Sequence, residues 1–241
     1  MGLYSIPCIQ GFDLNRHDYF YGGMLMSTAR LPDPQSGSPA AEPNWLELDR
    51  SPHALQFYSG NGPLLDSLVR FISTALEEGD SVFVLATPVH MDGIAERLRV
   101  QGVDTSTAAE KGRYVTVDAF EVLAHLTVNG KLSRVRFDEF IREVFMPLEV
   151  AAESQPKAVA VCGEVVSLLW ADGKAQAAIE LEHLWNELAE RVCCRLRCFY
   201  PIAAFSDTGQ NELFLKLCTE HAHVIPHQNH PRKVTSRHKA A

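Results

Sequence analysis

The chain has 241 residues, a formal net charge of −8, 46% hydrophobic residues and 22% charged residues. These values are typical of a globular domain and exclude a wholly disordered or collagen-like chain. The acidic balance also argues against a dedicated nucleic-acid-binding domain, which usually carries a surplus of basic residues.

Composition divides the chain into three parts. Residues 1–49 form an arm that includes the proline-rich linker 31–43, residues 50–226 carry strand and helix patterns, and residues 227–241 form a basic tail without an acidic residue. The linker and the tail contain too little apolar surface to offset the entropy lost on ordering, so we expect both to be disordered. The fold is therefore predicted within residues 50–226.

Strands and helices alternate along that block. Apolar runs bounded by turn residues predict strands over 54–58, 81–86, 113–118, 157–163 and 194–201. Apolar residues at helical spacing predict helices over 64–76, 91–101, 119–128, 133–147, 164–170, 174–190 and 210–221. This alternation indicates βαβ units, and thus an α/β fold with a mostly parallel central sheet covered on both faces.

Ligands of open parallel sheets bind outside the carboxyl ends of the strands. The residues that we expect at this edge, and propose as ligand-binding, are Tyr58, Ser59, Asn61, His90, Glu164 and Tyr200. Glu164 is the expected polar anchor and the two tyrosines are the expected aromatic walls. The alternative for Glu164 is a charge that complements a helix dipole, and Asp118, another strand-end acid, is expected to be a helix N-cap.

The turn Ser59–Pro63 follows the first strand and enters a helix. Glycine-rich turns of this kind can hold phosphate through backbone N–H groups. A working phosphate loop, however, has Lys and Ser or Thr after its last glycine, whereas Gly62 is followed by Pro63 and Leu64. We therefore interpret the segment as a tight strand-to-helix turn.

No metal or cofactor site is predicted. Cys218, His221, His223 and His227 are of metal-ligand types, but their spacing is not that of a known zinc site. The chain also has no complete catalytic motif, so no catalytic residue is predicted. Trp170 and Trp185 are expected in the core, with stacking on a ligand as the alternative.

The sequence also bears on the cellular compartment. No apolar run reaches the ~18 residues that a membrane-spanning helix needs, and the N-terminus does not have the pattern of a signal peptide. The six cysteines show no disulfide framework, so we expect a cytoplasmic protein.

Several segments in a fixed order resemble one family. They are HALQFY (53–58), VFVLATPVH (82–90), GRYVTVDA (112–119), VCGEVVSLLWADG (161–173), AAIELEHLWNEL (177–188), CFYP (198–201) and CTEHAHVIP (218–226). Together they resemble the MEDS domain, the sensory domain of methanogen and methylotroph proteins and of the dichloromethane repressor, over residues 50–226. This resemblance implies a three-layer RecA/KaiC-like P-loop fold in which the phosphate loop has lost its lysine.

The resemblance also implies a function, namely sensing of small molecules such as hydrocarbon derivatives. We expect a non-enzymatic sensory domain that signals through a histidine kinase or regulator, or through its own oligomer, without direct contact to nucleic acid or membrane. The alternatives are a nucleotide-binding or weakly active ATPase-like module, and a ligand-free interaction scaffold.

Overall fold

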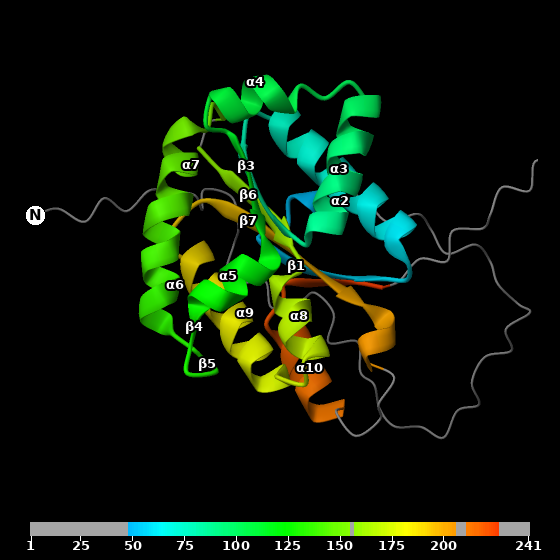
Figure 1. The fold of residues 1–241 in the computed structure, drawn as a ribbon, viewed down its shortest axis with the longest axis vertical. Helices are drawn as coiled ribbons and strands as arrows, with labels where there is room; N and C mark the ends of the chain where they lie inside the picture. Colours follow the sequence, from blue (N-terminus) through cyan, green and yellow to red (C-terminus); the bar gives the residue numbers. More distant parts are fainter. Residues whose placement is uncertain (1–47, 155–156, 206–210, 227–241) are drawn as a thin grey trace, which may run out of the picture.

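The computed structural model describes residues 48–154, 157–205 and 211–226 (Figure 1). The predicted linker 31–43 and tail 227–241 lie outside these ranges.

The centre of the molecule is a parallel sheet of six strands. Its order is β3-β2-β6-β7-β1-β8. The strands are β1 (His53–Tyr58), β2 (Ser81–Ala86), β3 (Tyr114–Asp118), β6 (Val159–Gly163), β7 (Cys194–Pro201) and β8 (His223–Ile225). A separate antiparallel hairpin consists of β4 (Thr127–Val128) and β5 (Lys131–Leu132). The predicted α/β class with a mostly parallel sheet is thus confirmed.

Helices follow most of the strands. They are α2 (Asn61–Glu77), α3 (Pro88–Val100), α4 (Thr105–Glu110), α5 (Ala119–Leu126), α6 (Arg134–Phe140), α7 (Met146–Ala151), α8 (Val165–Ala171), α9 (Ala175–Ala189) and α10 (Asn211–Thr219). A π-helical turn (Ile141–Phe145) joins α6 to α7, and a 3₁₀ turn (Ile202–Phe205) follows β7. None of the helices in the described ranges combines the length and the hydropathy needed to cross a bilayer.

Two apolar cores lie on the two faces of the sheet. Helices α2 and α3 cover one face, where Leu64, Ile72 and Leu98 pack on Val84 and Phe199. Helices α5, α6, α8, α9 and α10 cover the other face (Figure 1). Because both faces are covered, β2 and β6 are nearly continuous apolar runs, as parallel strands usually are.

The structure adds elements that the sequence patterns did not indicate. The helix predicted over 119–128 ends at Leu126, and Thr127 and Val128 form β4 instead. Asn129 and Gly130, where the helix was expected to stop, adopt φ values of 51° and 77° and turn the chain between β4 and β5. Two consecutive residues with positive φ favour a tight hairpin. Helix α4 and the three-residue strand β8 were also not predicted, since both are too short to show a periodic pattern.

The strand register determines which chain segments meet at the carboxyl edge. Leu85 of β2 pairs with Gly163 of β6, and Gly163 pairs with Cys198 of β7. Tyr58 of β1 pairs with Pro201 of β7. The residues just after β2 and β6 are therefore neighbours, whereas the end of β1 is separated from them by β7.

Candidate ligand-binding site

Strands β2 and β6 approach each other closely at their carboxyl ends. A Cβ atom on Gly163 would lie 2.3 Å from the carbonyl oxygen of Leu85, a distance that real Cβ atoms essentially never show. The next residue, Glu164, donates its backbone N–H to the same carbonyl at 3.0 Å. Glycine at position 163 thus lets Glu164 lie directly beside the end of β2.

The Glu164 carboxylate holds the beginning of helix α3. It accepts the backbone N–H of Thr87 at 2.7 Å, and both of its oxygens contact Nδ1 of His90, at 2.8 and 2.9 Å. A carboxylate only accepts hydrogen bonds, so Nδ1 of His90 carries a proton. The Glu164 side chain is 7% exposed and the His90 side chain 13%, which makes the imidazole the more accessible of the two.

Glu164 also begins helix α8. It is the N-cap residue of that helix, and its backbone carbonyl accepts the hydroxyl of Ser167 at 2.8 Å. Thr87 is the N-cap residue of α3. One side chain therefore connects the first turns of two helices that cover opposite faces of the sheet.

Tyr58, at the end of β1, is separated from this pair by β7 but is near enough to be affected by the charge of Glu164. Burial, and then the negative charge of Glu164, raise the pKa of the Tyr58 hydroxyl to about 12. The phenol consequently stays neutral, and its nearly buried ring belongs to the apolar core on the α2 face of the sheet.

Ser59 and Asn61 are both exposed on the turn that follows β1. Only Ser59 and Gly60 separate β1 from α2. Leu64 is fully buried in the core, and Arg97 donates to the carbonyl oxygen of Gly62 at 3.0 Å. The position after Pro63 thus serves packing and offers no hydroxyl to a metal-bound phosphate.

Tyr200 is not part of this group. Its side chain is fully buried in the core beneath α8 and α9, and its hydroxyl donates to Oε1 of Glu182 at 2.9 Å. Successive residues of a strand point to opposite faces of a sheet, so Phe199 faces α2 and Tyr200 faces the other side. The sequence located Tyr200 near a strand end but did not determine its face.

The other residues considered in the sequence have structural contacts. Asp118 is the N-cap of α5, as predicted, and accepts the N–H of Phe120 at 2.8 Å. Trp170 and Trp185 are each 4% exposed and belong to the core. His223 bonds Ser51 through Nδ1 at 2.9 Å. Position 227 lies outside the described residues.

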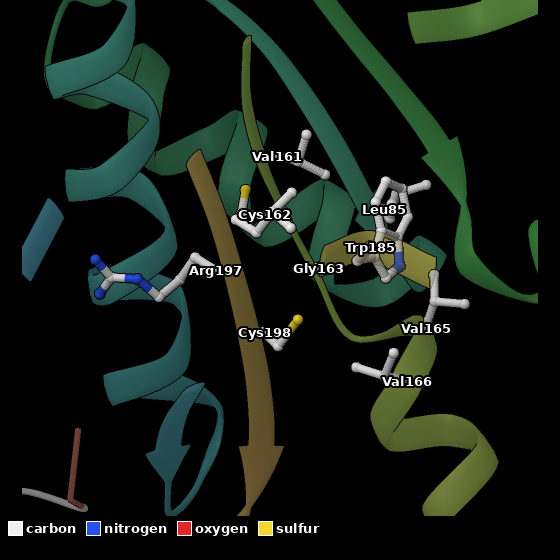
Figure 2. Close-up of a pocket in the computed structure, with 10 residues that line it drawn as sticks. Leu85, Val161, Cys162, Gly163, Val165, Val166, Trp185, Arg197 and Cys198 are labelled. Carbon is white, nitrogen blue, oxygen red and sulfur yellow. The ribbon is translucent and has the colours of Figure 1, made fainter. Parts of the chain in front are cut away.

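A small cavity lies under the sheet between β2, β6 and β7. Leu85, Val161, Trp185 and Cys198 are among its lining residues, and Figure 2 shows Arg197 directed away from Trp185, toward the opposite face. Its volume of about 20 Å³ has room for about one water molecule. The cavity is therefore a packing defect of the core rather than the space for an organic ligand.

Sequence reasoning missed the direct pairing of His90 with Glu164. Both had been placed at the same sheet edge, but their contact depends on β2 and β6 being adjacent strands, which no local pattern reveals. The glycine before Glu164 was the available signal, because glycine at a strand end often marks close approach of another backbone.

These features define an open α/β domain with a half-buried polar pair at the carboxyl edge of its sheet. The family model MEDS, described as the methanogen/methylotroph, DcmR sensory domain, matches residues 52–215. The chain belongs to this family. None of the curated proteins matches the chain.

Three solved structures from Pyrococcus horikoshii are similar to the chain. A KaiC-like protein is 16% identical, with 76% of each chain covered and a TM-score of 0.46. A second protein, described only as the subject of a structural study, is 12% identical, with 77% of this chain and 86% of that one covered and a TM-score of 0.46. An uncharacterized protein in complex with an unknown peptide is 15% identical, with 75% and 82% covered and a TM-score of 0.47.

Proposed function

We propose that this chain is a non-enzymatic sensory domain of prokaryotic signal transduction, acting in the cytoplasm, whose small-molecule ligand binds at the carboxyl edge of the sheet beside His90 and Glu164. Membership of the MEDS family supports a sensory role in general. The hydrocarbon derivatives associated with that family are the ligand class to test first. The observation that carries the location is the His90–Glu164 pair.

The pair can turn ligand binding into a conformational signal. The Glu164 carboxylate connects the N-cap of α3 to the N-cap of α8, and these helices lie on opposite faces of the sheet. A ligand hydroxyl or amine that competes for this carboxylate weakens its bonds to Thr87 and His90. The ligand then favours a conformer in which α3 is shifted relative to α8, which is a population shift.

A partner surface must then detect that shift. The partner that we propose is a signalling protein such as a histidine kinase or a regulator, with a second copy of this chain as the other route of output. Either partner reads the positions of the helices and needs no access to the ligand itself.

Ligand binding at the His90–Glu164 pair can be tested with small molecules of known structure. Methanol and methylamine, which carry a hydroxyl and an amine, are titrated against the wild type and Glu164→Gln, with binding followed by calorimetry. The amide keeps the size of the carboxylate but replaces one acceptor oxygen by a donor. Affinity for a probe that binds the wild type should fall by roughly 1.5–3 kcal/mol, the usual worth of a hydrogen bond to a charged group.

Asp118→Asn is the matched control, because it neutralises another strand-end acid while asparagine still caps a helix well. It should bind the probe as the wild type does. Equal affinity of wild type and a folded Glu164→Gln protein would remove the pair from the ligand site.

The absence of enzymatic activity is supported by the turn between β1 and α2. Two residues separate these elements, and the position after Pro63 is a buried leucine. We expect no Mg²⁺-dependent ATP hydrolysis above a blank, measured as phosphate release. Turnover that disappears in Glu164→Gln would contradict the proposal and favour an ATPase-like module in which this carboxylate orients water.

A further inference from the structure

A second polar cluster is enclosed between the sheet and helices α9 and α10. It consists of His53 on β1, Glu182 on α9, Cys198 on β7 and His221, which follows α10. All four are buried, with exposed fractions between 0% and 8%. One donor atom from each residue lies within 4.8 Å of the donor atoms of the other three.

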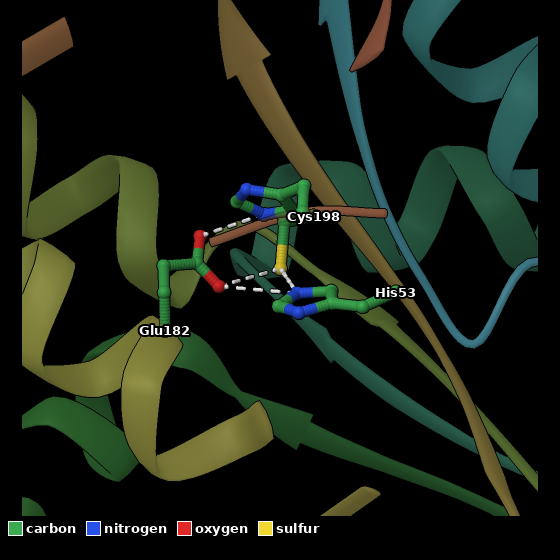
Figure 3. Close-up of side chains that lie close together, drawn as sticks. His53, Glu182 and Cys198 are labelled. Atoms are coloured by element: carbon green, nitrogen blue, oxygen red, sulfur yellow. Dashed lines mark hydrogen bonds and ion pairs between the residues drawn. The ribbon is translucent and has the colours of Figure 1, made fainter. Parts of the chain in front are cut away.

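The nitrogen, sulfur and oxygen atoms of the four side chains lie close to one another. Nε2 of His53 lies 3.3 Å from Sγ of Cys198 and 3.3 Å from Oε2 of Glu182 (Figure 3). Sγ of Cys198 lies 3.2 Å from the same oxygen, and Nε2 of His221 lies 3.4 Å from Oε1 of Glu182. Nitrogen, sulfur and oxygen ligands bound to one tetrahedral zinc ion lie about 3.3–3.6 Å apart.

The tautomer of His53 is fixed from outside the cluster. The amide nitrogen of Asn186 donates to the backbone carbonyl of Glu220 at 2.7 Å, and a carbonyl can only accept. The amide oxygen of Asn186 therefore faces Nδ1 of His53, at 2.7 Å, and Nδ1 carries the proton. In the neutral ring, Nε2 then directs a lone pair at Glu182 and Cys198.

His221 is arranged in the same way. Its Nδ1 donates to the backbone carbonyl of Leu217 at 2.8 Å. Its Nε2 is buried and makes no hydrogen bond within the described residues, although it lies within ion-pair distance of Glu182. In the neutral ring, Nε2 of His221 directs a lone pair at Glu182, as Nε2 of His53 does. A cation between these groups, or a proton on an imidazole, then balances the carboxylate.

We propose that this cluster binds one zinc ion through Nε2 of His53, the carboxylate of Glu182, Sγ of Cys198 and Nε2 of His221. Imidazole, thiolate and carboxylate are the ligand types that zinc takes in proteins, and four protein ligands make a closed, structural site. The Cys198 thiol releases its proton to solvent on binding. The ion, one thiolate, one carboxylate and two neutral imidazoles then sum to zero charge, which suits a buried position.

Residues around the cluster form hydrogen bonds to the proposed zinc ligands, as residues around a metal site usually do. Asn186 and the Leu217 carbonyl hold the two imidazoles, and the Tyr200 hydroxyl donates to Oε1 of Glu182 at 2.9 Å. Outer partners of this kind fix ring orientation and tune affinity. The ion joins elements that are far apart in the sequence, because His53 begins β1 and His221 precedes β8.

The test uses the full chain, reduced, freed of metal with a chelator and titrated with Zn²⁺ and separately with Co²⁺. We expect one equivalent of Zn²⁺, and for Co²⁺ a sulfur-to-metal charge-transfer band with visible bands of tetrahedral intensity. Zinc at about 100 times its Kd should raise the Tm by roughly 5–11 °C.

Variants identify the donors. Cys198→Ser should abolish the sulfur-to-cobalt band, whereas Cys162→Ser and Cys218→Ser should keep it. Cys162 is buried to a similar degree but packs on the α2 face, and Cys218 lies three residues from His221 without belonging to the cluster. Asn186→Ala should weaken zinc binding about 10–100-fold.

The rival explanation is a metal-free cluster in which protons on the imidazoles balance Glu182. Failure of the reduced wild type to bind stoichiometric Zn²⁺ would establish that rival and overturn the proposal. Loss of the sulfur-to-cobalt band in Cys218→Ser would also overturn the proposal. The same holds if the affinity for zinc is unchanged in both His221→Gln and Asn186→Ala. Replacement of the three tail histidines, His227→Gln, His230→Gln and His238→Gln, should leave zinc binding intact, and loss of binding in that variant would show that the tail holds the metal.

Discussion

Single residues at the carboxyl edge are held to tight steric limits. Gly163 is required because the carbonyl oxygen of Leu85 occupies the place of a side chain. Gly62, in the first turn of α2, is different, since a Cβ there would meet no atom within 4 Å. The two glycines therefore make a matched pair.

Gly163→Ala should destabilise the protein by at least about 1–3 kcal/mol, the usual cost of overpacking, because a backbone carbonyl cannot move aside as a flexible side chain can. Gly62→Ala should be neutral or stabilise by about 0.5–1 kcal/mol, because alanine loses less entropy in a helix. Urea denaturation midpoints measure both. Equal stability of the two variants would mean that the β2–β6 approach is looser than described.

At the scale of elements, a buried arginine fastens the segment before β1 to the sheet. Arg197 on β7 donates to the carbonyl of Leu48 at 2.7 Å and to Oδ1 of Asp49 at 2.9 Å, and its guanidinium lies 5.2 Å from the centre of the Phe71 ring. Burial lowers the pKa of Arg197 to about 10, although the Asp49 charge opposes this. The ion pair thus lies almost wholly out of water.

Asp49→Ala should cost about 3–5 kcal/mol of unfolding free energy, because it leaves the arginine buried and without its carboxylate. Arg197→Met should cost less, since Asp49 keeps an ion pair with Arg70 at 3.3 Å. Arg50→Ala is the control, because the side chain of Arg50 is 62% exposed and such surface pairs contribute about 0–1 kcal/mol. Chemical denaturation measures the free energy of unfolding of the three variants. An equal loss of stability in Asp49→Ala and Arg50→Ala would show that the buried ion pair does not stabilise the fold more than a surface pair.

At the scale of the whole molecule, the sheet separates two apolar cores that share only its strands. The His90–Glu164 pair joins helices α3 and α8, which belong to different cores. The pair is therefore the contact between the two layers on which the proposed sensory mechanism depends.

The folded unit should not depend on the proline-rich linker or the basic tail. A chain without residues 31–43 and 227–241 should keep its Tm within a few degrees, because each lost kcal/mol lowers it by roughly 2–4 °C at this size. Differential scanning calorimetry of the full and shortened chains measures this. A large fall in Tm or in soluble yield would show that one of these segments packs on the domain.

Much of the fold could be predicted because most of its strands and helices follow from the pattern of apolar residues in short segments of the chain. The runs that became β2 and β6 are apolar enough to be recognised as strands, and the stripe from Leu64 to Leu76 marks α2. Short elements such as α4 and β8 escaped, since six or three residues cannot show a period. Their formation depends on contacts with distant parts of the chain.

The candidate site was predicted only in part for a related reason. Position after a strand places Glu164 and His90 at one edge, but their pairing depends on strand order, which long crossovers determine. Tyr200 shows the same limit, because a shift of one residue along a strand reverses the face. The sequence therefore located Tyr200 at the carboxyl edge of the sheet but did not show on which face its side chain lies.

The sequence by itself determined the class of fold, the family and the missing lysine of the phosphate loop, because each depends on residues close together in the chain. Only the tertiary structure decided that Glu164 holds His90, and that His53, Glu182, Cys198 and His221 surround one point. Those four residues span positions 53 to 221, and no periodicity links residues so far apart. Parallel strand order and helix packing bring them together, because a buried carboxylate must find donors or a cation wherever the fold supplies them.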